Sequence, residues 1–307
     1  MGRNGGALVI ILLMTIHWCP TLRCNAETPG SADERFHVGL STSMFGDVKE
    51  NDVKAAAKIW ARTLYKERGV PIYEDVIIFE NVEEVAHALR NRQVEAVGLN
   101  TVEYWVLQKQ IRSERVVVSV YDGSYTEEYL LLVHKDSRIE RVEDLKGRKL
   151  MFPIHPRMAL AEYWLDIVLA NGGHGPAPKF FNIEKLTKLP RAVLPVFFRQ
   201  SDACVVTRRA FQTMCELNPQ LGGSLKVIAA SPKMVPGGFF FRSDASPSLR
   251  ERTFASFEEV QKSPAYQQAL ILFQTQQLKV FPITILDETF ALLAAHSRLI
   301  AASMEAR

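Results

Sequence analysis

Short apolar segments alternate with longer amphipathic segments along most of the chain. Residues 36–40 predict a first strand, and residues 52–68 predict a helix, with Asn51 as a candidate N-cap and Gly69 just past its end. The apolar positions of this helix recur every three or four residues, at Val53, Ala57, Trp60 and Leu64. Strands this short, separated by helices, are typical of a parallel or mixed sheet that helices cover on both faces.

The same alternation continues to about residue 241. Further strands are predicted at 76–79, 96–99, 116–121, 129–135, 150–153, 203–206, 225–230 and 239–241. Further helices are predicted at 82–89, 102–110, 158–171, 189–198 and 208–217, with a helical turn at 142–145 and a loop at 173–178. The tail from 246 to 296 is interpreted as helical. The fold class is therefore α/β.

The strand–helix rhythm starts twice, and this predicts two lobes. One α/β unit runs to about residue 125 and a second to about residue 235, so we assign 35–125 plus 237–307 to lobe 1 and 126–236 to lobe 2. The chain crosses between them near 121–128 and again near 232–238. Two mixed-sheet lobes joined by two crossings form a hinged cleft, and the helical tail completes the fold.

Residues 1–26 have the layout of an export signal. Arg3 is followed by a mostly apolar run at 7–18 and by small residues near Ala26, although an uncleaved anchor is the alternative. Without this segment, two cysteines remain, Cys204 and Cys215. An oxidising compartment permits a disulfide between them, and two buried thiols are the alternative.

Composition excludes several classes of function. The 307 residues are 47% apolar with a formal net charge of +3, and the basic residues are spread along the chain, so no nucleic-acid partner is expected. The seven histidines form no His-x-x-x-His pair, and Cys-x-x-Cys and Gly-x-Ser-x-Gly are absent from the sequence. We therefore expect no enzyme activity, no catalytic residues, no cofactor, no metal site, and a monomer.

Several motifs together resemble a known family. They are FHVGL at 36–40, VEAVGL at 94–99, LLLVHKDS at 130–137, VEDLKGRKL at 142–150, DACVV at 202–206 and RRAF at 208–211. In this order they resemble the phosphate, phosphite and phosphonate-binding proteins of ABC transporters, which are type II periplasmic binding proteins. The resemblance implies a two-lobed trap in the periplasm, with a membrane permease as partner. It implies a small anion as ligand, such as phosphonate, phosphite or another organic oxyanion. The alternative is a periplasmic ligand sensor that signals to a membrane kinase.

Candidate ligand contacts follow the predicted strands, because ligands of open α/β sheets bind at the carboxyl ends of strands, near helix N-termini. Hydroxyls, amides and cations at these places suit an oxyanion. The candidates are Ser41, Thr42, Ser43, Asn100, Thr101, His155, Arg157 and Thr207, and the first crossing adds Tyr125 and Glu127. Each has a local alternative as a helix cap, a turn residue, a solvated surface residue or part of the hinge packing.

One segment departs from the family pattern. Residues 153–159 read Pro-Ile-His-Pro-Arg-Met-Ala, where phosphonate binders carry a turn rich in serine and threonine. A His/Arg pair binds anions as well, so a carboxylate or another organic anion fits equally. Glu127 and Glu128 would instead suit an amine or a sugar hydroxyl. The sequence therefore leaves the ligand open.

Overall fold

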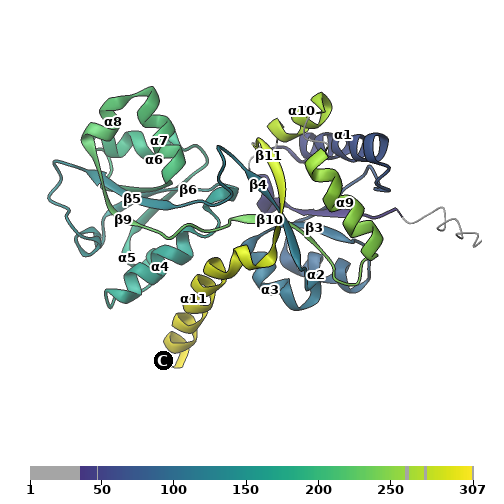
Figure 1. The fold of residues 1–307 in the computed structure, drawn as a ribbon. Helices are drawn as coiled ribbons and strands as arrows, with labels where there is room; N and C mark the ends of the chain where they lie inside the picture. Colours follow the sequence, from purple (N-terminus) through teal and green to yellow (C-terminus); the bar gives the residue numbers. More distant parts are fainter. Residues whose placement is uncertain (1–34, 47, 260–262, 273–274, 306–307) are drawn as a thin grey trace, which may run out of the picture. The chain divides into compact units, whose positions relative to one another are not determined.

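Two β-sheets organise the part of the chain that the structure describes. The structure is a computed structural model and describes residues 35–46, 48–259, 263–272 and 275–305. The predicted signal peptide at 1–26 lies outside the described residues. All described residues belong to one compact unit, Arg35–Arg307. Figure 1 shows that helices cover both faces of each sheet, as the alternating sequence pattern predicts.

The first sheet has six strands in the order β11-β4-β10-β3-β1-β2. The strands are β1 (Val38–Ser41), β2 (Ile77–Phe79), β3 (Ala96–Asn100), β4 (Arg115–Val120), β10 (Gly237–Phe241) and β11 (Gln277–Pro282). β1 is parallel to β2 and β3, whereas β10 and β11 run antiparallel to their neighbours. The sheet is therefore mixed, with its parallel strands on the β2 side.

Helices bury two separate cores against the six-stranded sheet. One face packs against α1 (Glu50–Arg68), α9 (Pro247–Glu259) and α10 (Pro264–Leu272). The other face packs against α2 (Val82–Arg90) and α3 (Thr101–Ile111). Gly69 ends α1 with a φ of 62°, the left-handed conformation that glycine adopts at little cost. Asn81 caps α2 by accepting a hydrogen bond from the backbone N–H of Glu84.

The second sheet has five strands in the order β7-β6-β8-β5-β9. The strands are β5 (Tyr129–His134), β6 (Lys149–Pro153), β7 (Asn182–Leu186), β8 (Ala203–Thr207) and β9 (Leu225–Ala230). Its faces carry α4 (Ala161–Asn171) with α5 (Ala177–Phe180), and α6 (Pro190–Phe197) with α7 (Arg208–Leu217) and α8 (Pro219–Ser224). Successive residues of β5 enter opposite cores, which explains its unbroken apolar run.

Two chain segments connect the sheets and pair with each other. The segment after β4 and the segment after β9 meet where Glu127 and Met234 exchange two backbone hydrogen bonds, of 2.7 and 2.8 Å. The strands of each sheet fall within one of the two lobes assigned from the sequence. The lobe boundaries themselves, at 125/126 and 236/237, remain a prediction.

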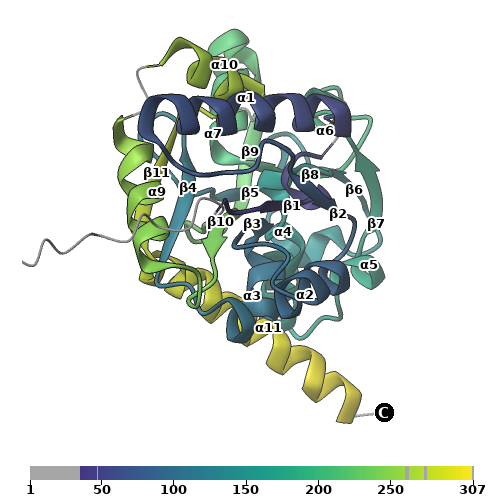
Figure 2. The ribbon, with the colours of Figure 1, turned by 90° about the vertical axis from the view of Figure 1, so that its right-hand side faces the viewer.

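The C-terminal helix α11 (Asp287–Glu305) contacts elements of both sheets. It packs against α3 and α4, and Figure 2 shows it running beneath α3 and past the end of the sheet. Leu292 and Leu293 enter the core that α4 covers. Nε2 of His296 lies 2.9 Å from Oδ2 of Asp166 on α4. The tail is thus a structural part of the unit.

One element prediction is wrong, and one strand was not predicted. The tail is not entirely helical, because β11 pairs antiparallel with β4 and completes the six-stranded sheet. The segment 182–186 was not predicted as a strand, yet β7 pairs parallel with β6. β7 is an edge strand with exposed side chains and therefore lacks an apolar signal.

The helix predicted from residue 158 begins later. Pro156–Met158 form a short 3-10 helix, η3, and α4 starts at Ala161. Other 3-10 helices among the described residues are η1 (Thr42–Met44), η2 (Val142–Leu145) and η5 (Ile283–Leu286). Cys204 in β8 and Cys215 in α7 are both free thiols, and burial raises the pKa of each. The sequence left a disulfide or two separate thiols open for this pair, and the structure shows two separate thiols.

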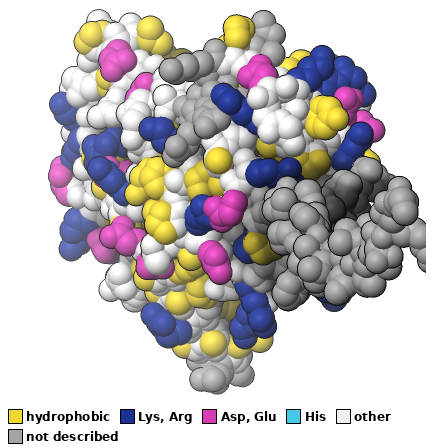
Figure 3. Space-filling model, turned by 45° about the vertical axis from the view of Figure 1, so that its right-hand side comes forward, with side chains coloured by type: hydrophobic (Ala, Val, Ile, Leu, Met, Phe, Trp, Pro, Cys, Tyr) yellow, Lys and Arg dark blue, Asp and Glu magenta, His cyan; other side chains and the backbone are white. Residues whose placement is uncertain are grey.

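Charged side chains of both signs are interspersed on the surface. On the face shown in Figure 3, Lys and Arg lie among Asp and Glu, with apolar side chains between them. Many charged side chains of the protein pair with one another, for example Lys149 with Glu184 at 2.7 Å and Lys226 with Glu140 at 2.6 Å. Exposed pairs of this kind contribute little to stability.

Candidate functional site

A cavity of about 680 Å³ lies beside the first connecting segment. Residues from elements of both sheets line it, because Tyr121 follows β4, Thr275 precedes β11, and Arg157 and Arg209 come from η3 and α7. The other polar lining residues are His155, Thr207, Thr213 and Gln276. The apolar lining residues are Met158, Leu189, Pro190, Ala210, Met214 and Ile271. This volume is typical of cavities that hold organic ligands.

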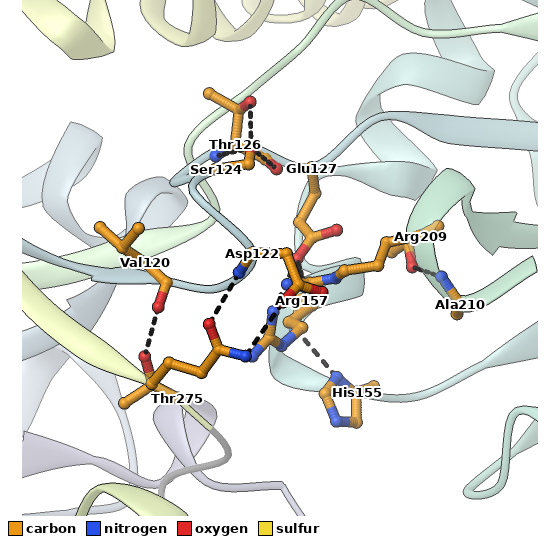
Figure 4. Close-up of polar contacts among 12 residues, drawn as sticks. Val120, Asp122, Ser124, Thr126, Glu127, His155, Arg157, Arg209, Ala210 and Thr275 are labelled. Atoms are coloured by element: carbon orange, nitrogen blue, oxygen red, sulfur yellow. Dashed lines mark hydrogen bonds and ion pairs between the residues drawn. The ribbon is translucent and has the colours of Figure 1, made fainter. Parts of the chain in front are cut away.

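A buried carboxylate holds the two arginines of the cavity. Oε1 of Glu127 accepts a hydrogen bond from Nη1 of Arg157 at 2.9 Å and another from Nη2 of Arg209, and Figure 4 shows both guanidinium groups turned toward it. The side chain of Glu127 is 5% exposed, compared with 21% and 23% for the arginines. Burial raises the pKa of Glu127 to about 7, against the lowering effect of Arg209. Two cations therefore share one carboxylate.

An aromatic ring orients both guanidinium groups. Cζ of Arg157 lies 5.5 Å from the ring centroid of Tyr121, and Cζ of Arg209 lies 4.6 Å from it. These distances suit cation–π contacts, which hold a planar guanidinium group against a ring. Tyr121 is thus part of the arginine cluster, together with Glu127. We call these four side chains the Glu127 cluster: Tyr121, Glu127, Arg157 and Arg209.

Local backbone structure places Arg157. Nδ1 of His155 accepts a hydrogen bond from the backbone N–H of Arg157 at 3.2 Å, which starts η3 with Pro156 in its first turn. The hydroxyl of Tyr129 donates to the carbonyl oxygen of Arg157 at 2.8 Å. Burial raises the pKa of Tyr129, so its hydroxyl keeps this proton. The turn is therefore held from both sides.

The start of α7 places Arg209. The side chain of Thr207 caps the helix by accepting from the backbone N–H of Ala210 at 3.2 Å. Arg208 and Arg209 then occupy the first turn, where positive charge opposes the helix dipole. Arg208 forms a two-pronged pair with Glu128, at 2.7 and 2.6 Å, and it holds the pKa of that carboxyl below its usual range. The acidic pair at 127–128 thus compensates the basic pair at 208–209.

A tight turn fixes the opposite wall of the cavity. The backbone N–H of Asp122 donates to Oε1 of Gln276, and Nε2 of Gln276 donates to Oδ1 of Asp122, both at 3.0 Å. The hydroxyl of Thr275 donates to the carbonyl oxygen of Val120 at 3.3 Å. Figure 4 shows these contacts next to the arginines. The turn after β4 is therefore tied to the strand that completes the sheet.

Three of the predicted contacts meet a different carboxylate, that of Glu103. The hydroxyl of Ser41 donates to Oε1 of Glu103 at 2.6 Å, and the hydroxyl of Ser43 donates to Oε2 at 2.7 Å. The backbone N–H of Asn100 donates to Oε2 at 3.1 Å, and the Asn100 side chain caps α3. We call these residues the Glu103 cluster: Ser41, Ser43, Asn100 and Glu103. None of them lines the cavity described above.

Three other predicted contacts also lie away from the cavity lining. The hydroxyl of Thr42 reaches the carbonyl oxygen of Glu80 at 3.5 Å, and that of buried Thr101 donates to the carbonyl oxygen of Val235 at 2.6 Å. The ring of Tyr125 packs against that of Phe281, with centroids 4.6 Å apart. Each of these contacts is made to another part of the protein itself.

The cavity brings together the remaining predicted residues. His155, Arg157 and Thr207 line it, and Glu127 lies behind Arg157. The sequence reasoning missed the other lining residues, among them Tyr121, Arg209 and Gln276. The sequence signal for Arg209 is the pair of arginines at 208–209, in the first turn of a helix that follows a strand. Positive charge at this position opposes the helix dipole, so a nearby negative charge is needed to balance it. Gln276 had no signal, because its segment was interpreted as helical.

Two searches of the described residues limit the chemistry of the site. Between residues 35 and 305, apart from the gaps given above, three or more His, Cys, Asp or Glu side chains nowhere gather as a metal site would require. Among the helices in the same part of the chain, none has both the length and the apolar character of a membrane span.

Comparisons with solved structures show a shared fold. The chloride-bound protein XAC2383 from Xanthomonas citri has a TM-score of 0.62 at 14% identity, with 87% of this chain and 99% of that chain covered. A binding protein component of an ABC phosphonate transporter (PA3383) from Pseudomonas aeruginosa has a TM-score of 0.57 at 16% identity, covering 87% and 88%. PhnD1 from Prochlorococcus marinus, in complex with methylphosphonate, has a TM-score of 0.53 at 14% identity, covering 84% and 96%. The two-lobed α/β fold predicted from the sequence is confirmed.

A family model identifies the chain more closely than these structures do. No curated protein sequence matches this chain. The model of the family described as ABC transporter, phosphonate, periplasmic substrate-binding protein matches residues 43–280. It is a family of transporter components and not of enzymes, and the resemblance seen in the sequence motifs is confirmed. The chain belongs to the family of periplasmic substrate-binding proteins of phosphonate ABC transporters.

Proposed function

We propose that this substrate-binding protein captures a small anion at Arg157 and Arg209. The observation that carries the proposal is the Glu127 cluster, in which two guanidinium groups at the cavity wall share one buried carboxylate. The cluster keeps one positive charge in excess. Positive charge in a partly enclosed site attracts anions more strongly than it does in open water.

The proposed ligand contacts are His155, Arg157, Thr207 and Arg209. Arg209 is added to the residues predicted from the sequence, and Glu127 and Tyr121 act by holding the arginines. We leave Ser41, Thr42, Ser43, Asn100, Thr101 and Tyr125 outside the contact set, because their described contacts are with the protein itself.

Elements of both sheets would hold the ligand. Arg157 and Arg209 come from the five-stranded side, and Tyr121 and Gln276 come from the six-stranded side. A ligand that bonds to both sides favours the conformation in which they are close together. We propose that this conformation docks on the permease. We also propose that the protein acts as a monomer.

A binding screen tests the proposal. The protein is titrated with phosphate, phosphite, phosphonates, sulfonates, carboxylates and amines, and thermal stability and calorimetric affinity are measured. A ligand at 100 times its dissociation constant adds about 2.7 kcal/mol of stability. We expect stabilisation by anions and none by amines.

Two variants locate the binding. Arg157→Ala should remove the stabilisation by anions. Arg138→Ala is the matched control, because Arg138 is an exposed arginine outside the cavity lining. Stabilisation by amines alone, or anion binding that survives Arg157→Ala, would contradict the proposal.

A further inference from the structure

The charges around Glu127 favour a ligand with one negative charge. Three charged side chains meet there: Arg157 from η3, Arg209 from the first turn of α7, and Glu127 itself. The phenol of Tyr129 on β5 interacts with Glu127, the ring of Tyr121 at the end of β4 contacts both arginines, and His155 lines the same cavity. Arg208 is occupied by Glu128 and adds no excess charge. Among the ion pairs of the described residues, an ionised Glu127 therefore leaves one positive charge to be balanced.

The carboxylate is a permanent part of the site. Glu127 is more deeply buried than either arginine, and its backbone pairs with Met234 in the second connecting segment. A guanidinium group carries five N–H donors, and each bond to Glu127 uses one of them. A ligand that enters from the cavity therefore reaches Arg209 on the side away from Glu127 and binds beside the carboxylate without displacing it.

The rest of the cavity wall is largely apolar and suits a ligand that carries an apolar group. Met158, Leu189, Pro190, Ala210, Met214 and Ile271 form a large part of the lining. The volume of about 680 Å³ far exceeds the roughly 30 Å³ that one water molecule occupies in the liquid, and a bare oxyanion leaves most of it unfilled. Burial of an apolar group against these side chains is favourable, whereas an inorganic anion gains nothing from them.

We propose that the ligand is a singly charged organic anion, and that Glu127 sets this preference by neutralising one of the two arginines. The inference rests on the proposed function, because it assumes that anions bind at Arg157 and Arg209. It makes Glu127 a specificity-determining residue. A second negative charge on the ligand would lie near the Glu127 carboxylate without a cation to balance it.

Matched probes of different charge test the inference. Benzenesulfonate and benzene-1,3-disulfonate share one ring and stay ionised across the pH range used, and propionate and succinate form a second pair. Affinities are measured by calorimetry at pH 8.5, where Glu127 is ionised, for wild type and Glu127→Gln. The glutamine keeps the size of the side chain and an oxygen that accepts from the arginines. We expect the ratio of dianion to monoanion affinity to rise at least about tenfold in the variant.

A pH series gives a second measurement that leaves Glu127 in place. Histidines change charge between pH 8.5 and 5.5, and His155 lines the same cavity, so the series is run on His155→Asn, whose side-chain oxygen can still accept from the backbone N–H of Arg157. Protonation of Glu127 removes its charge, so the ratio for the sulfonate pair should rise as the pH falls to 5.5. This series also settles the question if Glu127→Gln does not fold.

Each outcome has a distinct meaning. Equal ratios in wild type and variant, with no change between pH 8.5 and 5.5, would overturn the role of Glu127. Binding of phosphate or phosphite without binding of any organic probe would overturn the inference that the ligand is organic, while the proposed function would stand. Failure of every anion to bind wild type would overturn the proposed function itself.

Discussion

Two clusters in this protein follow strand ends and hold a carboxylate, and they differ in what surrounds it. In the Glu103 cluster, two hydroxyls and a backbone N–H donate to the carboxylate, and these donors are neutral. In the Glu127 cluster, two guanidinium groups donate to it. The donors around Glu103 therefore add no positive charge to its cluster. At the Glu127 cluster, two guanidinium groups face one carboxylate, so one positive charge remains beside the cavity.

The difference shows how a strand-end motif acquires or loses a binding role. Hydroxyls and N–H groups at a strand end suit an anion of any origin, and Glu103 is an anion that the chain itself supplies. A ligand anion would therefore have to displace Glu103 from the hydroxyls of Ser41 and Ser43. At the Glu127 cluster, a ligand anion can bind to the arginines without displacing Glu127. We therefore place the ligand at the second cluster, and the predictions below test this contrast.

The largest expected effect is on ligand affinity at the Glu127 cluster. Arg209→Met removes one of two cations while keeping an apolar side chain of similar length. Removal of one partner of a buried charge pair costs about 2–5 kcal/mol, so anion affinity should fall roughly 30-fold or more. Calorimetry with the tightest anion of the screen measures this, with Arg138→Met as control. An affinity within threefold of wild type would place the ligand elsewhere.

The next effect concerns stability and pH. The pKa of Glu127 is raised to about 7, above the value near 4.5 of an exposed glutamate. Between these values the folded state keeps a proton that the unfolded state releases, so a rise in pH lowers stability. At 1.36 kcal/mol per pH unit, wild type should lose about 3 kcal/mol relative to Glu127→Gln between pH 4.5 and 7. The free energy of unfolding is measured in urea at each pH for both proteins. If it changes with pH in the same way in wild type and in Glu127→Gln, the pKa of Glu127 is not raised.

The Glu103 cluster should respond in stability and not in binding. Glu103→Ala leaves the hydroxyls of Ser41 and Ser43 without their acceptor, and Ser41 is buried. An unsatisfied buried polar group costs about 1–3 kcal/mol. We expect that loss in denaturant unfolding, with anion affinity within about twofold of wild type. A tenfold loss of affinity would return this cluster to the binding site.

The smallest expected effect is at the start of α7. Thr207→Ala removes the helix cap and should cost about 1 kcal/mol of stability, with a modest loss of anion affinity because Arg209 follows in the next turn. Thr207→Ser keeps the capping oxygen and should restore both quantities. If Thr207→Ser behaves like Thr207→Ala, the methyl group and not the cap is responsible.

Elements with a local signal were predictable from the sequence. The continuous apolar run of β5 and the end of α1 at Gly69 appear where the pattern predicts them. β11 was not predictable in this way, because its strand conformation depends on pairing with β4, for example Val280 with Val117, about 160 positions earlier in the chain. Edge pairing over such a separation leaves little trace in a local pattern.

The candidate site was predictable as a set of strand ends but not as a set of contacts. The rule that ligands bind at strand ends led to His155, Arg157 and Thr207 and also to Ser41 and Ser43. The sequence does not show that Glu103, some 60 positions away, takes the serine hydroxyls. Nor does it show which arginine of the pair at 208–209 turns to Glu127 and which to Glu128. Side-chain pairing across the fold decides these points.

The most direct test of the contrast is to locate a bound anion. Crystals grown in bromide report the anion through its anomalous scattering. The account predicts a bromide peak in the cavity beside Arg157 and Arg209, with Glu103 still bonded to Ser41 and Ser43. A peak at Ser41 and Ser43 with Glu103 displaced, and none beside the arginines, would contradict it.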